Sequence, residues 1–129
     1  MLLNLGHAGW KPLSDTHDFV EWAPREYNVV ADHAANATMD CGIDWKIENS
    51  QGIAEAKATG ERFRICSDGG RRSGSLAAAG VAIYSVDVVD GCARCTELVR
   101  AGKQVQSIES AFLAEAVSLE WALDLFLEL

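Results

Sequence analysis

The sequence has little of what marks several large classes of protein. It contains only two prolines in 129 residues and is 49% hydrophobic, so disorder over its whole length is not expected. No apolar run reaches the roughly 18 residues that a membrane-spanning helix needs. The short uncharged stretch 1–5 does not have the form of a secretory signal. These absences predict a soluble, intracellular globular protein with no membrane partner.

Basic residues are also scarce, with 11 Lys and Arg against 19 Asp and Glu and a formal net charge of −8. This balance argues against a broad nucleic-acid-binding surface, because such surfaces neutralise phosphates with Lys and Arg. A nuclease site built from carboxylates and metal is itself acidic, which accounts for part of the charge. A nucleic-acid surface would therefore depend on local basic clusters at Arg62–Arg64, Arg71–Arg72 and Arg100–Lys103.

The four cysteines do not form a familiar metal-ligand pattern. Cys92 and Cys95 have the C-x-x-C spacing, but a structural zinc site needs a second pair of ligands at comparable spacing, and none follows. A redox pair normally opens a helix, whereas this pair lies in a strand-like stretch. We interpret these residues as reduced thiols. The alternative, a small zinc-binding domain, predicts stoichiometric zinc and loss of the fold with a chelator.

Residues 62–129 carry the clearest structural pattern. A strand is predicted over 63–68, followed by a Gly-rich loop, and two more strands over 77–89 and 92–100 are joined by a hairpin turn at Asp90-Gly91. A turn is expected at 102–106. A helix then runs from about Ser107 to Leu127, capped by Ser107 or Ser110, with Ile108, Phe112, Leu119, Ala122 and Phe126 as its apolar stripe.

The first 61 residues are less regular. A short strand is predicted over 17–23 and ends at Pro24, and Asn28 caps a helix that runs to about Met39. Residues 41–61 have the character of a linker with a short helical turn at 53–58. The sequence therefore predicts a mixed α/β fold: a three-stranded antiparallel sheet with a long C-terminal helix, preceded by a strand–helix unit.

Two carboxylates stand out against this pattern. Glu115 lies on the helical stripe that should face the sheet, where an unpaired ionised carboxylate costs several kcal/mol. The alternative is a glutamate at the edge of the stripe that reaches water or an arginine. Asp68 ends the first predicted strand; the alternative there is a turn aspartate before two glycines. If the helix packs across the sheet, the two carboxylates meet at one end, where a divalent cation would relieve their repulsion.

The order of these features resembles the opening half of a ribonuclease H domain. The resemblance is carried by Ser67-Asp-Gly-Gly70, Ala79-Gly-Val-Ala-Ile-Tyr84 and Ser110-Ala-Phe-Leu-Ala-Glu-Ala116. A second stretch, Pro24-Arg-Glu-Tyr-Asn28-Val-Val-Ala-Asp32 with the helix that follows to Asp40, resembles the closing segment of retroelement-type ribonuclease H domains. The resemblance implies a division into a closing segment over 1–40, a linker over 41–61 and an opening half over 62–129.

The resemblance also implies a function. Asp68 and Glu115 match metal-binding residues of the family, and Asp32 matches its final catalytic aspartate, although an exposed helix acid is the alternative for Asp32. The expected cofactor is Mg²⁺ or Mn²⁺, and the expected reaction is hydrolysis of the RNA strand in an RNA–DNA hybrid by two ions about 4 Å apart. The matching segments nominate six residues for nucleic-acid contact: Arg25, Asn28, Gly69, Gly70, Arg71 and Arg72.

Two departures from the family pattern define the alternatives. The closing segment precedes the opening half, and the fourth strand, which carries a further metal-binding aspartate, is absent. His7 is no secure counterpart of the family's loop histidine. The chain is then either a slice across two tandem domains or a permuted, shortened domain in which strand 17–23 takes the vacant place. It is an endonuclease, or an inactive ribonuclease H-like fragment that acts as a binding module. An open edge on the first strand of the opening half predicts a homodimer formed by strand addition.

Overall fold

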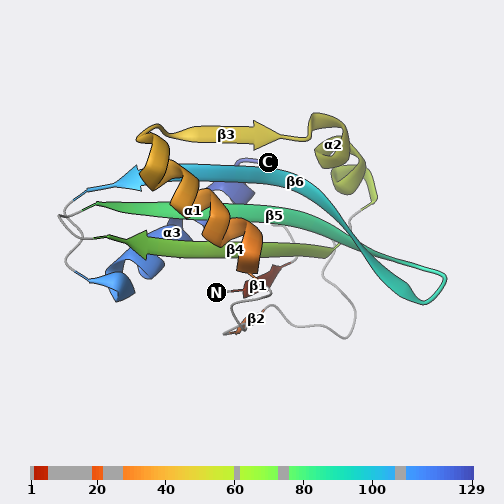
Figure 1. Cartoon of the computed structure of the whole chain (residues 1–129). Helices are drawn as coiled ribbons and strands as arrows, with labels where there is room; N and C mark the ends of the chain where they lie inside the picture. Colours follow the sequence, from red (N-terminus) through yellow and green to blue (C-terminus); the bar gives the residue numbers. More distant parts are fainter. Residues whose placement is uncertain (1, 6–18, 22–27, 60–61, 73–75, 107–109) are drawn as a thin grey trace.

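The computed structural model describes residues 2–5, 19–21, 28–59, 62–72, 76–106 and 110–129. Its elements are β1 (Leu2–Leu5), β2 (Phe19–Glu21), α1 (Val29–Cys41), β3 (Trp45–Glu48), α2 (Ser50–Thr59), β4 (Arg62–Arg71), β5 (Ala77–Val89), β6 (Cys92–Val105) and α3 (Ala111–Leu127). The strands form a six-stranded sheet in the order β2-β1-β4-β5-β6-β3, and its neighbouring strands pair antiparallel (Figure 1). The predicted mixture of helices with an antiparallel sheet is confirmed.

The centre of the sheet is the predicted β4–β5–β6 meander. β5 has the predicted bounds, and the turn after it places Asp90 and Gly91 at φ 52° and 78°. Positive φ at both central residues is the conformation that two-residue type I′ hairpins require. The turn predicted at 102–106 is wrong, because β6 continues to Val105. Gly102 lies within the sheet, where a Cβ would be 1.9 Å from the Thr38 hydroxyl of α1.

The two long helices pack on opposite faces of this meander. Figure 1 shows α1 in front of the sheet and α3 behind it. Both approach the sheet over glycines: a Cβ at Gly80 would lie 2.0 Å from the Ala31 carbonyl oxygen of α1, and a Cβ at Gly69 would lie 2.2 Å from the Ala114 backbone of α3. Since no real Cβ fits at these distances, the two glycines set how closely each helix lies against the sheet.

The two faces are filled differently. The α3 face holds the larger core, in which Phe63 packs on Phe126 with ring centroids 5.3 Å apart. The α1 face is filled mainly by small side chains, including Ala31, Cys66 and Ala82. Because the stabilisation grows with the apolar area buried, the larger side chains on the α3 face supply more hydrophobic stabilisation than the small ones on the α1 face.

The predicted stripe of α3 is wrong at its N-terminal end. Phe112 is 77% exposed, whereas Ala114, Ser118, Ala122 and Phe126 are buried. These four residues recur every four positions and therefore share one face of the helix. The small side chains in the first turns are needed because α3 lies so close to Gly69, and a phenylalanine in their place would not fit. Ile108 lies outside the described residues.

Residues 41–61, for which the sequence predicts a linker, contain β3 and α2. β3 pairs with β6 from Trp45 opposite Gly102 to Glu48 opposite Val99. Its side chains are mostly exposed, so it lacks the alternating apolar pattern by which a strand is recognised in a sequence. Backbone pairing with β6 explains this strand better than any preference of its own residues.

The strand that pairs with the outer edge of β4 is also not the predicted one. β1 pairs with β4 along Phe63–Cys66, and β2 pairs with β1 on the far side. The strand predicted at 17–23 is thus present as β2, but it lies one position further from β4. β1 covers the part of the β4 edge that was expected to be open. Within the described ranges, no helix is long and apolar enough to cross a membrane.

Candidate active site

Asp68 lies near the end of β4 on the face covered by α1. Along β4 the side chains alternate, so that Phe63 and Ile65 join the α3 core while Cys66 packs against α1. Asp68 follows Cys66 by two positions and so shares its face. The backbone of α1 approaches β5 at Gly80, which is the residue paired with Asp68 in the sheet. Asp68 therefore lies beside the first turns of α1.

Asp32, in the first turn of α1, has the largest electrostatic effect of any residue on Asp68. Burial is the largest cause of a pKa of Asp68 that is raised to about 7, and a hydrogen bond with the Asp32 side chain and the negative charge of Asp32 act in the same direction. Two carboxylates can be joined by a hydrogen bond only when one of them carries the proton. The raised pKa of Asp68 therefore favours its protonated form, as expected when like charges meet in a partly buried site.

Asn28 fixes the start of α1 against β4. The structure confirms that α1 begins after Asn28, but the Asn28 side chain makes no capping hydrogen bond to the helix. Its Nδ2 instead donates to the carbonyl oxygen of Ser67, at 2.8 Å, and Asn28 is only 8% exposed. The bond holds Asn28, which lies four positions before Asp32, against Ser67, which immediately precedes Asp68. Asn28 was predicted to contact nucleic acid. Its positioning role could not be predicted, because the bond to Ser67 is not encoded in any local sequence pattern.

Glu115 reaches the same region from the opposite face of the sheet. It follows Ala114, whose backbone lies against Gly69, and the Glu115 nitrogen would be 2.5 Å from a Cβ at Gly69. Its side chain is partly exposed, and its negative charge makes a smaller contribution to the raised pKa of Asp68. The structure thus brings Asp32 and Asp68 into contact and holds Glu115 at longer range.

The Asp32–Asp68 pair offers only two carboxylates to a metal ion. In the part of the chain that the structure describes, no group of three or more His, Cys, Asp or Glu side chains is close enough to hold a metal ion. Two carboxylates still fit Mg²⁺, which usually keeps several waters and takes one or two protein carboxylates together with substrate phosphates. A cation would relieve the repulsion between the Asp32 and Asp68 carboxylates.

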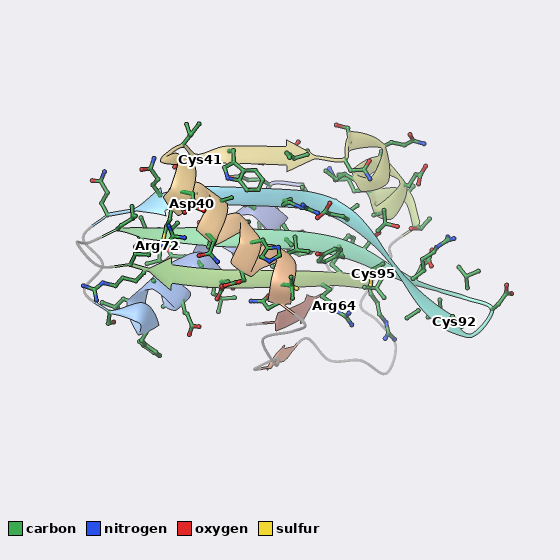
Figure 2. The ribbon with its side chains drawn as sticks, viewed as in Figure 1. Asp40, Cys41, Arg64, Arg72, Cys92 and Cys95 are labelled. Carbon is green, nitrogen blue, oxygen red and sulfur yellow. The ribbon has the colours of Figure 1, made fainter. Side chains whose placement is uncertain are left out.

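The residues nominated for nucleic-acid contact are mostly engaged within the protein. Gly69 lies under Ala114, and a Cβ at Gly70 would be 2.7 Å from the Met39 side chain. Arg72 forms an ion pair with Asp40 (Figure 2). It also donates to the Asn36 side-chain oxygen at 3.3 Å. Arg71 is exposed. Arg25 and His7 lie outside the described residues.

Arg64 is a further basic residue on the Asp68 face. It precedes Asp68 by four positions on β4, and Figure 2 shows it projecting from this strand. Its Nε is buried, and no described group accepts a hydrogen bond from it. From the sequence, Arg64 was assigned only to a basic cluster, although the alternation of side chains along the strand predicted at 63–68 is the signal that puts it on the face of Asp68.

The cysteines are free thiols. Cys92 and Cys95 lie exposed on β6, in the strand that the sequence predicts, and Cys41 is exposed at the end of α1. Cys66 is buried, and burial raises the pKa of its thiol to about 11, which keeps it protonated and unreactive at neutral pH.

Among the described residues, the Asp32–Asp68 pair is therefore the best-supported site. It combines a carboxyl whose pKa is raised, a buried positioning amide from Asn28 and a third carboxylate, Glu115, within electrostatic range. Comparisons of the chain with protein-family models, with curated proteins and with solved structures find no match, so the argument for a function depends on this geometry.

Proposed function

We propose that the chain is a ribonuclease H-like protein that hydrolyses the RNA strand of RNA–DNA hybrids with Mg²⁺ or Mn²⁺. One observation carries this proposal: the contact between Asp32 and Asp68. The two residues belong to the two segments that resemble the closing and opening parts of a ribonuclease H domain. Those segments are reversed in the chain, yet their carboxylates meet.

The same contact favours a permuted, shortened domain over a slice across two domains. α1 packs on the sheet that β4, β5 and β6 build, and the Asn28 side chain is bonded to Ser67 of β4. A slice across tandem domains would leave two separate half-sites with no reason to join. In this chain the closing and opening segments form one packed unit around β4.

Each residue of the site has a distinct role in this proposal. Asp32 and Asp68 would hold the cation, and Glu115 would add negative charge from the far face. When bound, Mg²⁺ or Mn²⁺ would supply an activated water and stabilise the leaving 3′-oxygen. Asn28 is a positioning residue, since it fixes the first turn of α1 relative to β4. Selectivity for RNA would depend on the 2′-hydroxyl, which is displayed in the wide minor groove of a hybrid.

A second candidate is a non-catalytic binding module of the same lineage. It is favoured by the net charge of −8 and by the lack of a three-ligand acidic group among the described residues. A binding module would keep the sheet and helices, since the core on the α3 face does not involve the carboxylates.

The test of the proposal is cleavage of a labelled RNA strand in an RNA–DNA hybrid with Mg²⁺ or Mn²⁺. We expect metal-dependent cutting that Asp68→Asn and Asp32→Asn abolish, because each removes a metal-binding charge but keeps the shape of the side chain. Glu115→Gln should reduce cutting, whereas its matched control Glu120→Gln, exposed on the same helix, should not.

A metal titration separates the two candidates. Mg²⁺ should raise the midpoint of thermal unfolding of the unmodified protein, because a ligand that binds only the folded state stabilises it by mass action. The rise should disappear in Asp68→Asn and persist in Asp124→Asn, whose carboxylate lies exposed on α3. A folded protein that neither cuts the hybrid nor responds to Mg²⁺ or Mn²⁺ would refute the nuclease and leave the binding module.

A further inference from the structure

The outer edge of β3 pairs with no strand among the described residues. β3 ends the strand order, and in Figure 1 it runs along the upper border of the sheet with its second edge facing away from β6. Lys46, Ile47 and Glu48 are all exposed, and Ile47 is 64% exposed. An uncovered strand edge is a template for another strand, which proteins normally block.

The register of β3 on β6 shows which backbone groups face this edge. Asn49 donates its N–H to the carbonyl oxygen of Leu98 in β6. In an antiparallel ladder alternate residues face the same neighbour, so Ile47 and Trp45 also direct their backbone groups to β6. Lys46 and Glu48 therefore direct theirs outward, to the open edge.

The side chains of Lys46 and Glu48 are oppositely charged and lie on one face. Lys46 Nζ is 2.9 Å from Glu48 Oε1, a contact that residues two apart on a strand can make because their side chains project from the same face. Ile47 projects from the other face, where Trp45 contacts α1 through a 2.9 Å hydrogen bond to Thr38.

We propose that a second copy of this chain occupies the edge, with the two β3 strands antiparallel and Ile47 opposite Ile47 on the two-fold axis. This register places Lys46 opposite Glu48 of the other copy, twice over. In this register Lys46 and Glu48, whose backbone groups face outward, form hydrogen-bonded pairs with the other copy. The two Ile47 residues form the non-hydrogen-bonded pair between them, in which the side chains lie closer together.

The neighbouring symmetric registers are unfavourable. Lys46 opposite Lys46 or Glu48 opposite Glu48 would set like charges directly across the strands, which is destabilising. A lone lysine on an edge strand repels a second copy, and this is one way in which edges are protected. Glu48, two positions further on, reverses that effect and makes the four-residue strand complementary to itself.

The interface is small, so the dimer is weak. Four residues per copy offer about four backbone hydrogen bonds and two ion pairs, which places the contact among the smallest specific interfaces. We expect a Kd between the micromolar and millimolar range in low salt, and weaker association as salt screens the exposed pairs.

The test compares charge variants by sedimentation equilibrium over a wide range of protein concentration. The unmodified protein should show a monomer–dimer equilibrium. Lys46→Glu and Glu48→Lys should each associate roughly tenfold more weakly or worse, because both cross-strand pairs then carry like charges. Arg94→Glu makes the same change of charge at an exposed position of β6, near the hairpin turn and outside the part of β6 that pairs with β3, and should associate like the unmodified protein.

The decisive sample is an equimolar mixture of Lys46→Glu and Glu48→Lys. Across the proposed register each glutamate of one variant faces a lysine of the other, so the mixture should form a heterodimer about as tight as the unmodified homodimer. A mixture that stays monomeric while both variants are folded would overturn the proposal. So would an unmodified protein that is monomeric at millimolar concentration, or single variants that dimerise as well as it does.

Discussion

Replacing Asp68 by asparagine should make the folded protein more stable at neutral pH. Asp68 is partly buried beside Asp32, and burial and this neighbour raise its pKa from 3.8 to about 7. A difference of that size corresponds to at most about 4 kcal/mol between folded and unfolded states. Asp68 retains some contact with solvent, which weakens the effect, so we expect a gain of about 1–2 kcal/mol.

The gain in unfolding free energy that Asp68→Asn produces should increase with pH. Below about pH 4 the carboxyl is protonated in both the folded and the unfolded chain, and it contributes nothing. Between about pH 4 and pH 7 the unfolded chain releases the proton while the folded protein retains it, so the unfolding free energy of the unmodified protein falls as pH rises. The amide of the Asp68→Asn variant cannot ionise, so this variant should lack the fall, and the difference should be largest above about pH 7.

Urea denaturation at a series of pH values, in buffer with a chelator, measures this difference. Asp124→Asn is the control, since it makes the same chemical change at an exposed position of α3. An Asp68→Asn protein that is less stable than the unmodified one at neutral pH would refute the assignment of a protonated, partly buried Asp68. A difference that is equal at all pH values would refute it as well.

Three further substitutions test how the helices are placed. Gly80→Ala should destabilise the protein by about 3 kcal/mol in urea denaturation, because its Cβ would lie 2.0 Å from the Ala31 carbonyl oxygen and force α1 off the sheet. Asn28→Ala removes the buried bond to Ser67 and should cost about 1–3 kcal/mol and lower any hybrid cleavage, while retention of full activity would contradict its positioning role. Ser110→Ala removes the hydroxyl that accepts from the Leu113 N–H at 3.2 Å and should cost about 1 kcal/mol of thermal stability.

Much of the sheet could be predicted because its signals are local. The bounds of β5 follow from a continuous apolar run, and the Asp90-Gly91 turn after it requires positive φ at both residues. β3 could not be predicted in the same way, since its residues are mostly exposed and it is held by β6. The extent of β6 was missed because Gly102 resembles a turn glycine, whereas it is a point of contact with α1.

The sequence could nominate Asp32 and Asp68 as candidates, but it could not predict that they lie in contact. Asp32 and Asp68 were selected by the residues around them, and their contact depends on α1 lying close to Gly80, which no local pattern encodes. The exposure of Phe112 has the same origin. The predicted stripe assumed that large residues face the sheet, whereas the close approach at Gly69 requires small ones.

The order of the elements along the chain has a consequence for how the protein acquires its structure. α1 is synthesised before β4, β5 and β6, yet its buried alanines have no other described surface to cover than the sheet these strands form. The bond from Asn28 to Ser67 likewise joins residues that are far apart in the sequence. Such non-local contacts slow folding, because the loop between them must be closed before they contribute. During synthesis on the ribosome, α1 therefore cannot pack until β4, β5 and β6 have emerged. A translation arrest after α1 would leave the apolar face of this helix exposed to chaperones.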